Sequence, residues 1–267
     1  MDKLERVIEI LKGMDGAVVA CSGGVDSTFL LKLAAMSGIR TLAVTSASPS
    51  HPEWDLRAAS EMAALIGAPH RIIRTDELEN PKYSANGPDR CYHCKNELFA
   101  ALRRIAGEEG LECVLDGSTA DDALDFRPGF LAARSHGVRS PLMEAGLGKK
   151  EIRWHSRRLG LPTWEKPSSP CLASRVPYGT PITGERLNKI FLSEAALREL
   201  GLREFRVRDH GTVARLEVAR EEFQFALEIK DEIIKKLKKH FKFVSLDLEG
   251  FRSGSLNTAL DPTGKPD

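Results

Sequence analysis

A short glycine-containing turn near the start of the chain constrains its fold more than any other feature. The sequence S-G-G-V-D-S at 22–27 follows an apolar run at 17–21 and precedes a segment, 28–34, in which apolar residues recur with helical spacing. This order predicts a strand, a tight turn and the first turn of a helix. Adjacent glycines let the backbone approach a ligand, and the N–H groups of a helix start favour an anion. With the Ser22 and Ser27 hydroxyls beside them, these groups predict a phosphate-binding loop.

The spacing of this loop excludes the commonest phosphate-binding motif. It does not match G-x-x-x-x-G-K-[ST], and no lysine stands where one would hold a β- or γ-phosphate. The hexapeptide resembles the pyrophosphate loop of the N-type ATP pyrophosphatases, which cleave ATP between the α- and β-phosphates and leave AMP on a substrate oxygen. An ordinary strand-to-helix turn is the alternative for the hexapeptide taken alone, and the strand before it and the helix after it favour the phosphate loop.

Short apolar runs alternate with helical patterns from the start of the chain to about residue 160. The expected strands are 17–21, 40–45, 70–74, 112–116 and a short one near 138–142, and the expected helices are 26–37, 53–66, 94–106 and 144–160. Such βαβ alternation predicts an α/β fold, in which helices cover both faces of a parallel sheet. Ligands of these folds bind at the carboxyl ends of the strands, so the site is expected there.

A second, smaller domain is expected after a proline-rich loop. Its expected elements are a helix at 184–200, strands at 203–209 and 212–219, a long helix at 220–239 and a strand at 242–250. They predict an α+β domain with antiparallel strands. The expected domains are an ATP pyrophosphatase domain at 1–165, a cysteine-bearing linker at 166–182 and a small domain for substrate binding or oligomerisation at 183–267. The tail after Gly254 has no periodicity and is expected to be disordered.

The charge of the chain limits its partners and its location. Its 267 residues carry a formal net charge of +1, which gives no general attraction to nucleic acids or anionic membranes. The lysine cluster at 235–239 lies at the expected end of a helix, where a solvated basic face explains it. The N-terminus is charged and no apolar run reaches 18 residues, so the chain is expected in the cytoplasm.

Small and acidic residues follow two further strands at the expected ligand edge. Thr45 and Ser46 end the second strand, where they would lie beside the phosphate loop and near an adenine ring. The segment D-G-S-T-A-D-D-A-L-D-F-R-P-G at 116–129 contains Gly117 and Asp121, and a nucleotide with its Mg²⁺ needs such small residues and carboxylates. Solvated loop acids are the alternative for this segment.

The five cysteines indicate metal binding, catalysis or burial rather than a disulfide framework. Cys21 and Cys113 lie inside apolar strands and are expected in the core. Cys91 and Cys94 form a C-x-x-C at the mouth of the helix expected from residue 94. The helix dipole and the flanking basic residues should lower the pKa of both thiols and favour thiolates.

The fifth cysteine, Cys171, stands in the proline-rich loop. A zinc site made by Cys171 with Cys91 and Cys94 would lack a fourth ligand. His93 is badly placed to complete the tetrahedron, because it lies between the two cysteines of the C-x-x-C. Dithiol chemistry at the C-x-x-C would leave Cys171 without a role. Three thiolates suit an iron–sulfur cluster with one open iron, because soft ligands select such clusters. We therefore expect the three cysteines to act together.

Alternation in the second domain places Arg206 and Arg208 on one face of a strand and Phe205 and Val207 on the other. Paired guanidiniums form either a solvated face or a clamp for a phosphate or carboxylate. The strand pattern alone leaves both alternatives open.

Several motifs together resemble those of the LarE family, the ATP-dependent sulfur transferases of nickel-pincer nucleotide biosynthesis. They are the S-G-G-V-D-S loop, the segment at 116–129, S-S-P-C-L-A-S-R-V-P-Y-G-T-P-I-T at 168–183, R-V-R-D-H at 206–210 and G-F-R-S-G-S-L-N at 250–257. The P-C-L-A-S-R and R-V-R segments are the most specific, and the resemblance covers about residues 4–257. It implies that ATP and Mg²⁺ adenylate a carboxylate of pyridinium-3,5-biscarboxylic acid mononucleotide, that pyrophosphate leaves, and that sulfur replaces AMP.

The resemblance also implies roles for single residues. Cys171 matches the cysteine that handles sulfur, Arg206 and Arg208 match residues that hold the substrate phosphate, and Glu194 matches an acidic site residue. Asp26 is expected to act in catalysis. The residues expected to bind the nucleotide and Mg²⁺ are Ser22, Gly23, Gly24, Asp26, Ser27, Thr45, Ser46, Gly117 and Asp121.

Members of this family differ in their source of sulfur. Some have only the cysteine of P-C-L-A-S-R and give up its own sulfur, which leaves dehydroalanine. Others carry a further C-x-x-C and are thought to hold a [4Fe–4S] cluster with a transferable sulfide. This chain resembles the second kind, so the expected cluster ligands are Cys91, Cys94 and Cys171.

Other functions are alternatives at this point. Related enzymes that thiolate tRNA also combine this loop with three cysteines and a cluster, but the near-neutral charge and the lack of an evident RNA-binding domain disfavour nucleic acid as a partner. A non-catalytic nucleotide- or iron–sulfur-binding protein would not need Asp26, Arg206 and Arg208, and an ammonia-fed ligase would not need three thiols. The expected partners are a nucleotide-like small substrate, an unidentified sulfur donor and further copies of the chain in a homo-oligomer, with no membrane.

Overall fold

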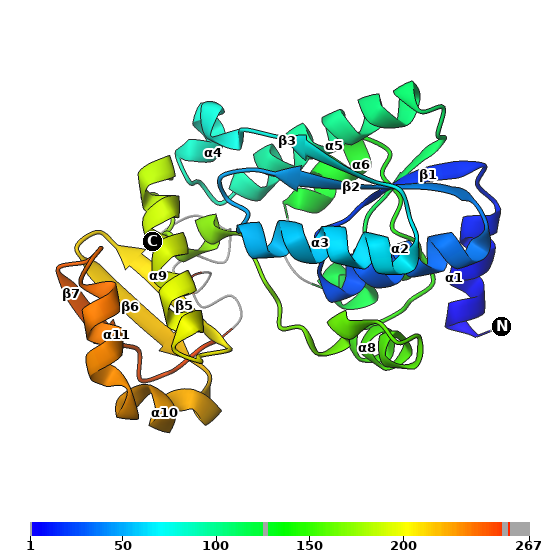
Figure 1. The fold of residues 1–267 in the computed structure, drawn as a ribbon. Helices are drawn as coiled ribbons and strands as arrows, with labels where there is room; N and C mark the ends of the chain where they lie inside the picture. The colour runs from blue at the N-terminus through cyan, green and yellow to red at the C-terminus, as the bar shows by residue number, and fades with distance from the viewer. Residues whose placement is uncertain (1, 125–127, 253–255, 257–267) are drawn as a thin grey trace. The chain divides into compact units, whose positions relative to one another are not determined.

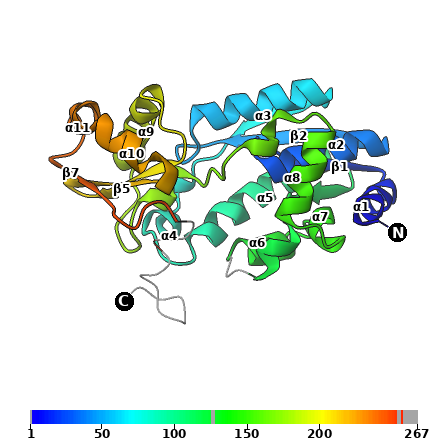
Figure 2. The same ribbon diagram turned by 90° about the horizontal axis from the view of Figure 1, so that it is seen from below.

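The computed structural model describes residues 2–124, 128–252 and 256 (Figures 1 and 2). The chain divides into two compact units: the first is Met1–Glu77 with Cys91–Ser169, and the second is Leu78–Arg90 with Pro170–Asp267. Leu78–Arg90 thus belongs with the C-terminal part of the chain, although the sequence pattern placed it inside the nucleotide domain. Residues 125–127 of the acidic segment and most of the tail expected to be disordered lie outside the described residues.

A four-stranded parallel sheet forms the centre of the first unit, as the βαβ alternation predicts (Figure 1). The strands are β1 (Gly16–Ala20), β2 (Arg40–Ala47), β3 (His70–Arg74) and β4 (Cys113–Leu115), in the spatial order β3-β2-β1-β4. Val18 of β1 pairs with Leu42 on one side and Val114 on the other. The carboxyl end of β1 is therefore flanked by the ends of β2 and β4.

Helices pack on both faces of this sheet. They are α1 (Lys3–Lys12), α2 (Val25–Ser37), α3 (Glu53–Ile66), α5 (Arg90–Glu108), α6 (Gly129–Ser135), α7 (Pro141–Glu144) and α8 (Lys149–Arg158), with 3-10 segments η1 (Glu77–Glu79), η2 (Ala120–Leu124) and η3 (Pro162–Glu165). Val19 packs in one core with α1, α2, α3 and α8, whereas Val18 packs in another with α5 and α6. None of the helices in the described ranges is long and apolar enough to span a bilayer.

Three local predictions in this unit are wrong. The region 138–142 forms only an isolated bridge between Leu115 and Arg139, because Pro141 then begins α7. The helix expected from residue 94 already begins at Arg90, so the C-x-x-C lies in its first turn and not in front of it. The helix expected at 144–160 is divided into α7 and α8, since the chain turns at Gly146 with φ +73°.

The second unit contains a three-stranded sheet. Its elements are α4 (Pro81–Ser84), η4 (Leu172–Arg175), α9 (Gly184–Glu199), β5 (Phe205–His210), β6 (Val213–Val218), η5 (Arg220–Glu222), α10 (Phe223–Glu228), α11 (Lys230–Leu237) and β7 (Phe243–Leu246). β5 and β6 are antiparallel as expected, but β7 runs parallel to β6, because the helices between them return the chain to the same end of the sheet. Phe205, Val207 and Leu216 pack against Leu197 and Ile233 in the core.

Glycine is required at two positions around the turn from β1 to α2. Gly23 has φ +67°, and a Cβ atom there would lie 2.6 Å from the backbone nitrogen of Ala59 in α3. A Cβ atom on Gly117, after β4, would lie 2.8 Å from the backbone nitrogen of Ser27. Both distances are shorter than the contacts that real Cβ atoms make in proteins. The backbone of the turn therefore lies in direct contact with α3 and with the loop after β4, and neither position has room for a side chain.

Gly23→Ala should destabilise the protein more than Gly38→Ala. Gly38 ends α2 with φ +78°, but a Cβ there would meet no described atom within 4 Å, so this control costs only the left-handed backbone, about 1–2 kcal/mol. Gly23→Ala adds a collision with the backbone of α3, and overpacking costs about 1–3 kcal/mol more. Urea unfolding measures the difference, and equal losses in the two variants would show that φ alone requires glycine at position 23.

Candidate functional site

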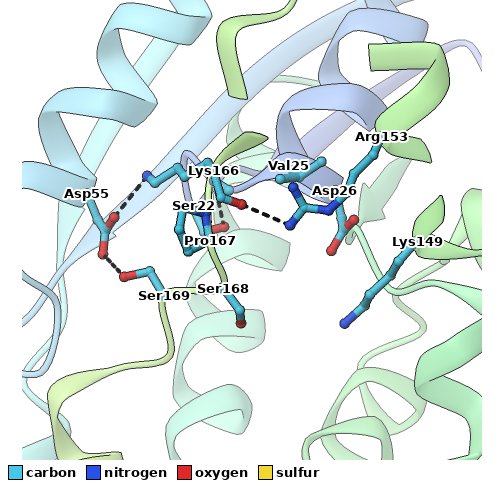
Figure 3. A pocket seen from close by; sticks show the side chains of 11 residues that line it. Ser22, Val25, Asp26, Asp55, Lys149, Arg153, Lys166, Pro167, Ser168 and Ser169 are labelled. Atoms are coloured by element: carbon cyan, nitrogen blue, oxygen red, sulfur yellow. Dashed lines mark hydrogen bonds and ion pairs between the residues drawn. The ribbon is translucent and has the colours of Figure 1, made fainter. Parts of the chain in front are cut away.

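A pocket of about 190 Å³ opens at the start of α2 in the first unit (Figure 3). It is lined by Ser22, Gly24, Val25, Asp26, Asp55, Lys149, Arg153, Lys166, Pro167, Ser168 and Ser169. The loop residues Ser22, Gly24, Val25 and Asp26 are therefore part of its wall. The remaining lining residues come from α3, α8 and the chain after η3.

Hydrogen bonds inside the turn fix the shape of this wall. The Ser22 N–H donates to Ser27 Oγ at 3.2 Å, and the two serine hydroxyls lie 3.1 Å apart. The Thr28 N–H donates to Gly24 O at 3.1 Å. The N–H groups of residues 25–27 precede this intrahelical bond, at the positive end of the α2 dipole. The turn thus presents backbone donors to an anion and carries the Asp26 carboxylate beside them.

Three basic side chains line the pocket, although the sequence analysis did not single them out. Lys149 and Arg153 lie one turn apart on α8, and Lys166 follows η3. Arg153 is oriented by two carbonyl groups, to which it donates at 2.6 Å (Trp164 O) and 2.9 Å (Lys166 O). Three cations beside a helix N-terminus suit a polyphosphate. The four-residue spacing on α8 was the sequence signal for two of them.

Lys166 joins the chain after η3 to the phosphate loop and to α3. Its Nζ donates to Gly23 O and to Asp55 Oδ1, both at 3.0 Å. Asp55 Oδ2 in turn accepts from Ser169 Oγ at 2.8 Å (Figure 3). These bonds hold residues 166–169 at the pocket, which explains why a loop of proline-rich composition is ordered there.

Thr45 lies beside the phosphate loop, where the sequence placed it. Its hydroxyl donates to Cys21 O at 2.7 Å and lies 2.8 Å from His70 Nε2. Ser46 Oγ bonds instead to Thr75 Oγ1. Both side chains thus brace neighbouring segments, and a contact of this edge with adenine stays a prediction.

The acidic residues after β4 organise the start of α8. Asp121 Oδ2 accepts the Lys149 N–H at 2.5 Å, and Asp122 Oδ1 lies 3.2 Å from Lys149 Nζ. Asp122 Oδ2 also accepts from the N–H and the hydroxyl of Thr119, each at 2.9 Å. The two carboxylates therefore position Lys149, and a direct contact of Asp121 with a nucleotide or Mg²⁺ stays a prediction.

The cysteines differ in exposure: Cys21 is buried, and Cys113 is half-buried against the same core. Burial raises the pKa of the Cys21 and Cys113 thiols, in keeping with small core side chains. Cys91 is exposed and Cys94 half-buried, one helical turn apart in α5 of the first unit, and Cys171 is half-buried in the second unit. In the described ranges, no group of three or more His, Cys, Asp or Glu side chains is placed to hold a metal ion.

One arginine fixes the loop that carries Cys171. Arg175, 1% exposed, donates to Pro170 O at 2.6 Å and to Cys171 O at 3.2 Å. Its Nε and Nη2 donate to the two oxygens of Glu194 at 2.9 and 3.0 Å. Glu194, fully buried in α9, also accepts the Val207 N–H at 3.1 Å. This pair ties the Cys171 loop to α9 and β5.

Glu194 is held as a carboxylate. Burial alone would raise its pKa, but the charge and hydrogen bonds of Arg175, the charge of Arg206 and the Val207 N–H together lower it. The geometry makes Glu194 the residue that orients Arg175. A part for Glu194 in the chemistry stays a prediction.

Neither Arg206 nor Arg208 lies on a solvated face, since they are 4% and 5% exposed. Arg206 donates to Phe205 O at 2.6 Å, and its guanidinium lies 4.7 Å from the ring centre of Phe251. Burial, followed by the charge of Arg175, lowers its pKa to about 10, so it keeps its charge at neutral pH.

Arg208 reaches the loop that carries Cys171. It donates to Ser174 O at 2.8 Å and pairs with Glu217 Oε2 at 2.6 Å. Ser174 is the third residue after Cys171. Hydrogen bonds of the second unit thus connect Glu194 and Arg208 with the segment that carries Cys171, and the roles expected for these residues stay predictions.

Comparison with known proteins identifies the fold. No protein-family model matches the chain. The solved structure of NMN synthetase from Francisella tularensis superposes with a TM-score of 0.51 at 19% identity, and the match covers 62% of this chain and 74% of that one. Together with the glycine turn at the end of β1, this likeness shows the fold of an ATP pyrophosphatase with a PP-loop.

Two relatives match almost the whole chain. An uncharacterised protein of Synechocystis is 42% identical over 97% of this chain and 98% of its own length. The pyridinium-3,5-bisthiocarboxylic acid mononucleotide synthase of Lactiplantibacillus plantarum is 34% identical over 97% of this chain and 95% of its own length. The chain belongs to the family of that synthase, the LarE family.

Removing the charge of Glu194 should destabilise the protein strongly at neutral pH. Glu194→Gln leaves the buried guanidinium of Arg175 without its counter-charge, which costs about 3–5 kcal/mol. Glu199→Gln is the matched control in α9, because Glu199 is 71% exposed and its pair with Lys236 is worth about 0–1 kcal/mol. Urea unfolding at about pH 7 measures both, and equal losses would contradict this account.

The same pair predicts a pH dependence. The pKa of Glu194 is lowered in the folded state, so its contribution is present above the unfolded-state pKa of about 4.3 and is lost as pH falls through the lower folded value. The gap in stability between wild type and Glu194→Gln should therefore narrow below about pH 4.3. A gap that stays constant at lower pH would show that the charge of Glu194 is not its source.

Proposed function

We propose that this enzyme is an ATP-dependent sulfur transferase of cofactor biosynthesis. It adenylates a carboxylate of pyridinium-3,5-biscarboxylic acid mononucleotide and replaces AMP with sulfur on the route to the nickel-pincer nucleotide. The main support is 34% identity over almost the full length of a pyridinium-3,5-bisthiocarboxylic acid mononucleotide synthase. The phosphate loop and its cationic pocket support the ATP-dependent step.

In the proposed first step, the triphosphate of ATP lies in the pocket of the first unit, where Lys149, Arg153 and Lys166 face its charge. Asp26 and the Ser22 hydroxyl are the hard oxygen donors that Mg²⁺ prefers, so the residues present fit this metal ion. A carboxylate oxygen of the substrate attacks the α-phosphorus, and pyrophosphate leaves with the electron pair of the broken P–O bond. AMP on the acyl oxygen then becomes the leaving group that a free carboxylate lacks.

The substrate phosphate is proposed to bind at Arg206 and Arg208. Buried guanidiniums form forked, charge-assisted hydrogen bonds with phosphate, which suits a nucleotide substrate. Arg175 and Glu194 position the Cys171 loop in the same unit. Arg208 also donates to Ser174 O, so one of the two proposed phosphate ligands is hydrogen-bonded to the loop proposed to handle sulfur.

We further propose that Cys91, Cys94 and Cys171 hold a [4Fe–4S] cluster. The donors fit, because thiolates are the usual ligands of such clusters, and Cys91 and Cys94, three residues apart in the first turn of α5, share a helix face. Cys171 adds the third thiol from an ordered loop. With three protein thiolates, one iron would have no protein ligand, and the group would supply the sulfide that replaces AMP.

Lys149→Ala should weaken ATP binding by about 10- to 100-fold, since it removes a charge-assisted bond to the triphosphate. Lys150→Ala is the matched control, because Lys150 is exposed on the same helix and is not part of the pocket lining. Isothermal titration calorimetry with ATP and Mg²⁺ measures both affinities. If the two variants bind ATP equally well, Lys149 does not contact the triphosphate.

Protein purified without oxygen should be brown and contain about four irons and four inorganic sulfides per chain. Serine at position 91, 94 or 171 should remove the cluster and repeated turnover, because a hard oxygen replaces a soft ligand. Cys113→Ser, which changes a cysteine outside this set, should keep both. The sacrificial route instead leaves Cys91 and Cys94 dispensable, and intact-mass spectrometry would then show the loss of H₂S from Cys171 in a colourless protein after one turnover.

Assay of the enzyme on two candidate substrates tests the proposed function itself. The pyridinium mononucleotide should give a thiocarboxylate together with AMP and pyrophosphate. Thiolation of tRNA without any reaction of the pyridinium mononucleotide would identify a tRNA-thiolating enzyme instead. Binding of ATP and iron without turnover of either substrate would identify a non-catalytic binding protein.

A further inference from the structure

Lys166 binds the phosphate loop directly and still has a donor to spare. Its Nζ donates to Gly23 O and to Asp55 Oδ1, both at 3.0 Å. An ammonium group carries three N–H bonds, and the third has no partner among the described residues. Because Lys166 lines the pocket, this N–H is available to a phosphate oxygen there (Figure 3).

Asp55 holds the ammonium group from a rigid position. It is the third residue of α3, where the helix dipole favours a carboxylate. Its backbone lies against the loop, since a Cβ atom on Gly23 would be 3.0 Å from Asp55 O. The side chain of Asp55 is 10% exposed and that of Lys166 is 25% exposed, so the solvent screens this pair only partly. A carboxylate on a helix thus fixes the end of a long, flexible side chain.

The second oxygen of Asp55 binds the same stretch of chain. Ser169 Oγ, three residues after Lys166, donates to Asp55 Oδ2 at 2.8 Å. Arg153 holds this stretch as well, through its bond to Lys166 O at 2.9 Å. Both carboxylate oxygens of Asp55 therefore have protein donors, which favours a role in orienting the chain over the binding of a metal ion.

We propose that Asp55 is a positioning residue for the triphosphate, an inference that rests on the proposed binding of ATP in this pocket. Asp55 acts through Lys166: it holds the ammonium group at the loop before ATP arrives, so less side-chain freedom is lost on binding. The carboxylate alone would repel a polyphosphate. Its pairing with Lys166 and its bond from Ser169 offset this repulsion, so the positioning effect prevails.

Asp55→Asn tests this assignment, because asparagine keeps the size of the side chain but removes the charge that holds Lys166. Glu53→Gln is the matched control, since Glu53 is exposed in the same turn of α3 and does not line the pocket. Isothermal titration calorimetry with ATP and Mg²⁺ measures the affinities. D55N should bind ATP about five- to tenfold more weakly than wild type, because a charge-assisted hydrogen bond becomes a neutral one. E53Q should match wild type.

The same substitution in a Lys166→Ala background shows whether Asp55 acts through Lys166. Without the ammonium group only the repulsion by Asp55 remains, so D55N should there leave the affinity for ATP unchanged or raise it. Equal weakening in both backgrounds overturns the assignment, and so does tighter binding of ATP by D55N alone. Asp55→Glu is the second variant: it keeps the charge but displaces the carboxylate, and it should weaken binding only where Lys166 is present.

The outcomes separate the role of Asp55 from the proposed function. A wild type that binds no ATP overturns both. A wild type that binds ATP, with a D55N variant of equal affinity, overturns the role of Asp55 and leaves the ATP site in place. A merely structural role lowers the Tm of D55N and leaves the ATP affinity of the folded variant unchanged, which also overturns the assignment.

Discussion

The close contact between the β1–α2 turn and its neighbours is the constraint on which the pocket of the first unit depends. Gly23 allows the turn to touch the backbone of α3, and Gly117 allows the loop after β4 to touch the first turn of α2. These contacts leave the start of α2 facing the pocket, where Lys166 binds the carbonyl of Gly23. Lys149 and Arg153 then bring positive charge to the same place. A phosphate loop that lacks its own lysine thus obtains cations from distant segments.

The second unit is organised by buried charge. Arg175 pairs with Glu194, and Arg208 pairs with Glu217. Well-packed apolar residues in the place of such buried ion pairs often give a protein of equal stability. What the ion pairs add is geometry, because each arginine also binds a carbonyl group of the segment 170–174. The loop of Cys171 is therefore held in one conformation by groups that also suit an anionic substrate. Asn86 and Arg90 support the same loop from another segment.

Local sequence patterns predict the centre of the first unit well. β1 to β4, α2 and α3 lie within a few residues of their expected positions, because apolar runs and glycine ends mark them directly. The pattern also assigned Arg206 and Arg208 to one strand face, but it could not tell that the face is covered. Burial depends on distant packing, which is also why Lys149, Lys166 and Asp55 were missed. The prediction of a short strand near 138–142 was wrong because Pro141 starts a helix there.

In the proposed reaction ATP activates a carboxylate of the substrate, and the fate of a carboxylate oxygen tests this step most directly. The enzyme is incubated with ATP and the pyridinium mononucleotide labelled with oxygen-18 in its carboxylates, and the AMP formed is analysed by mass spectrometry. Attack on the α-phosphorus followed by replacement of AMP transfers one labelled oxygen to the phosphate of AMP. Unlabelled AMP, or ADP as the product, would contradict the account.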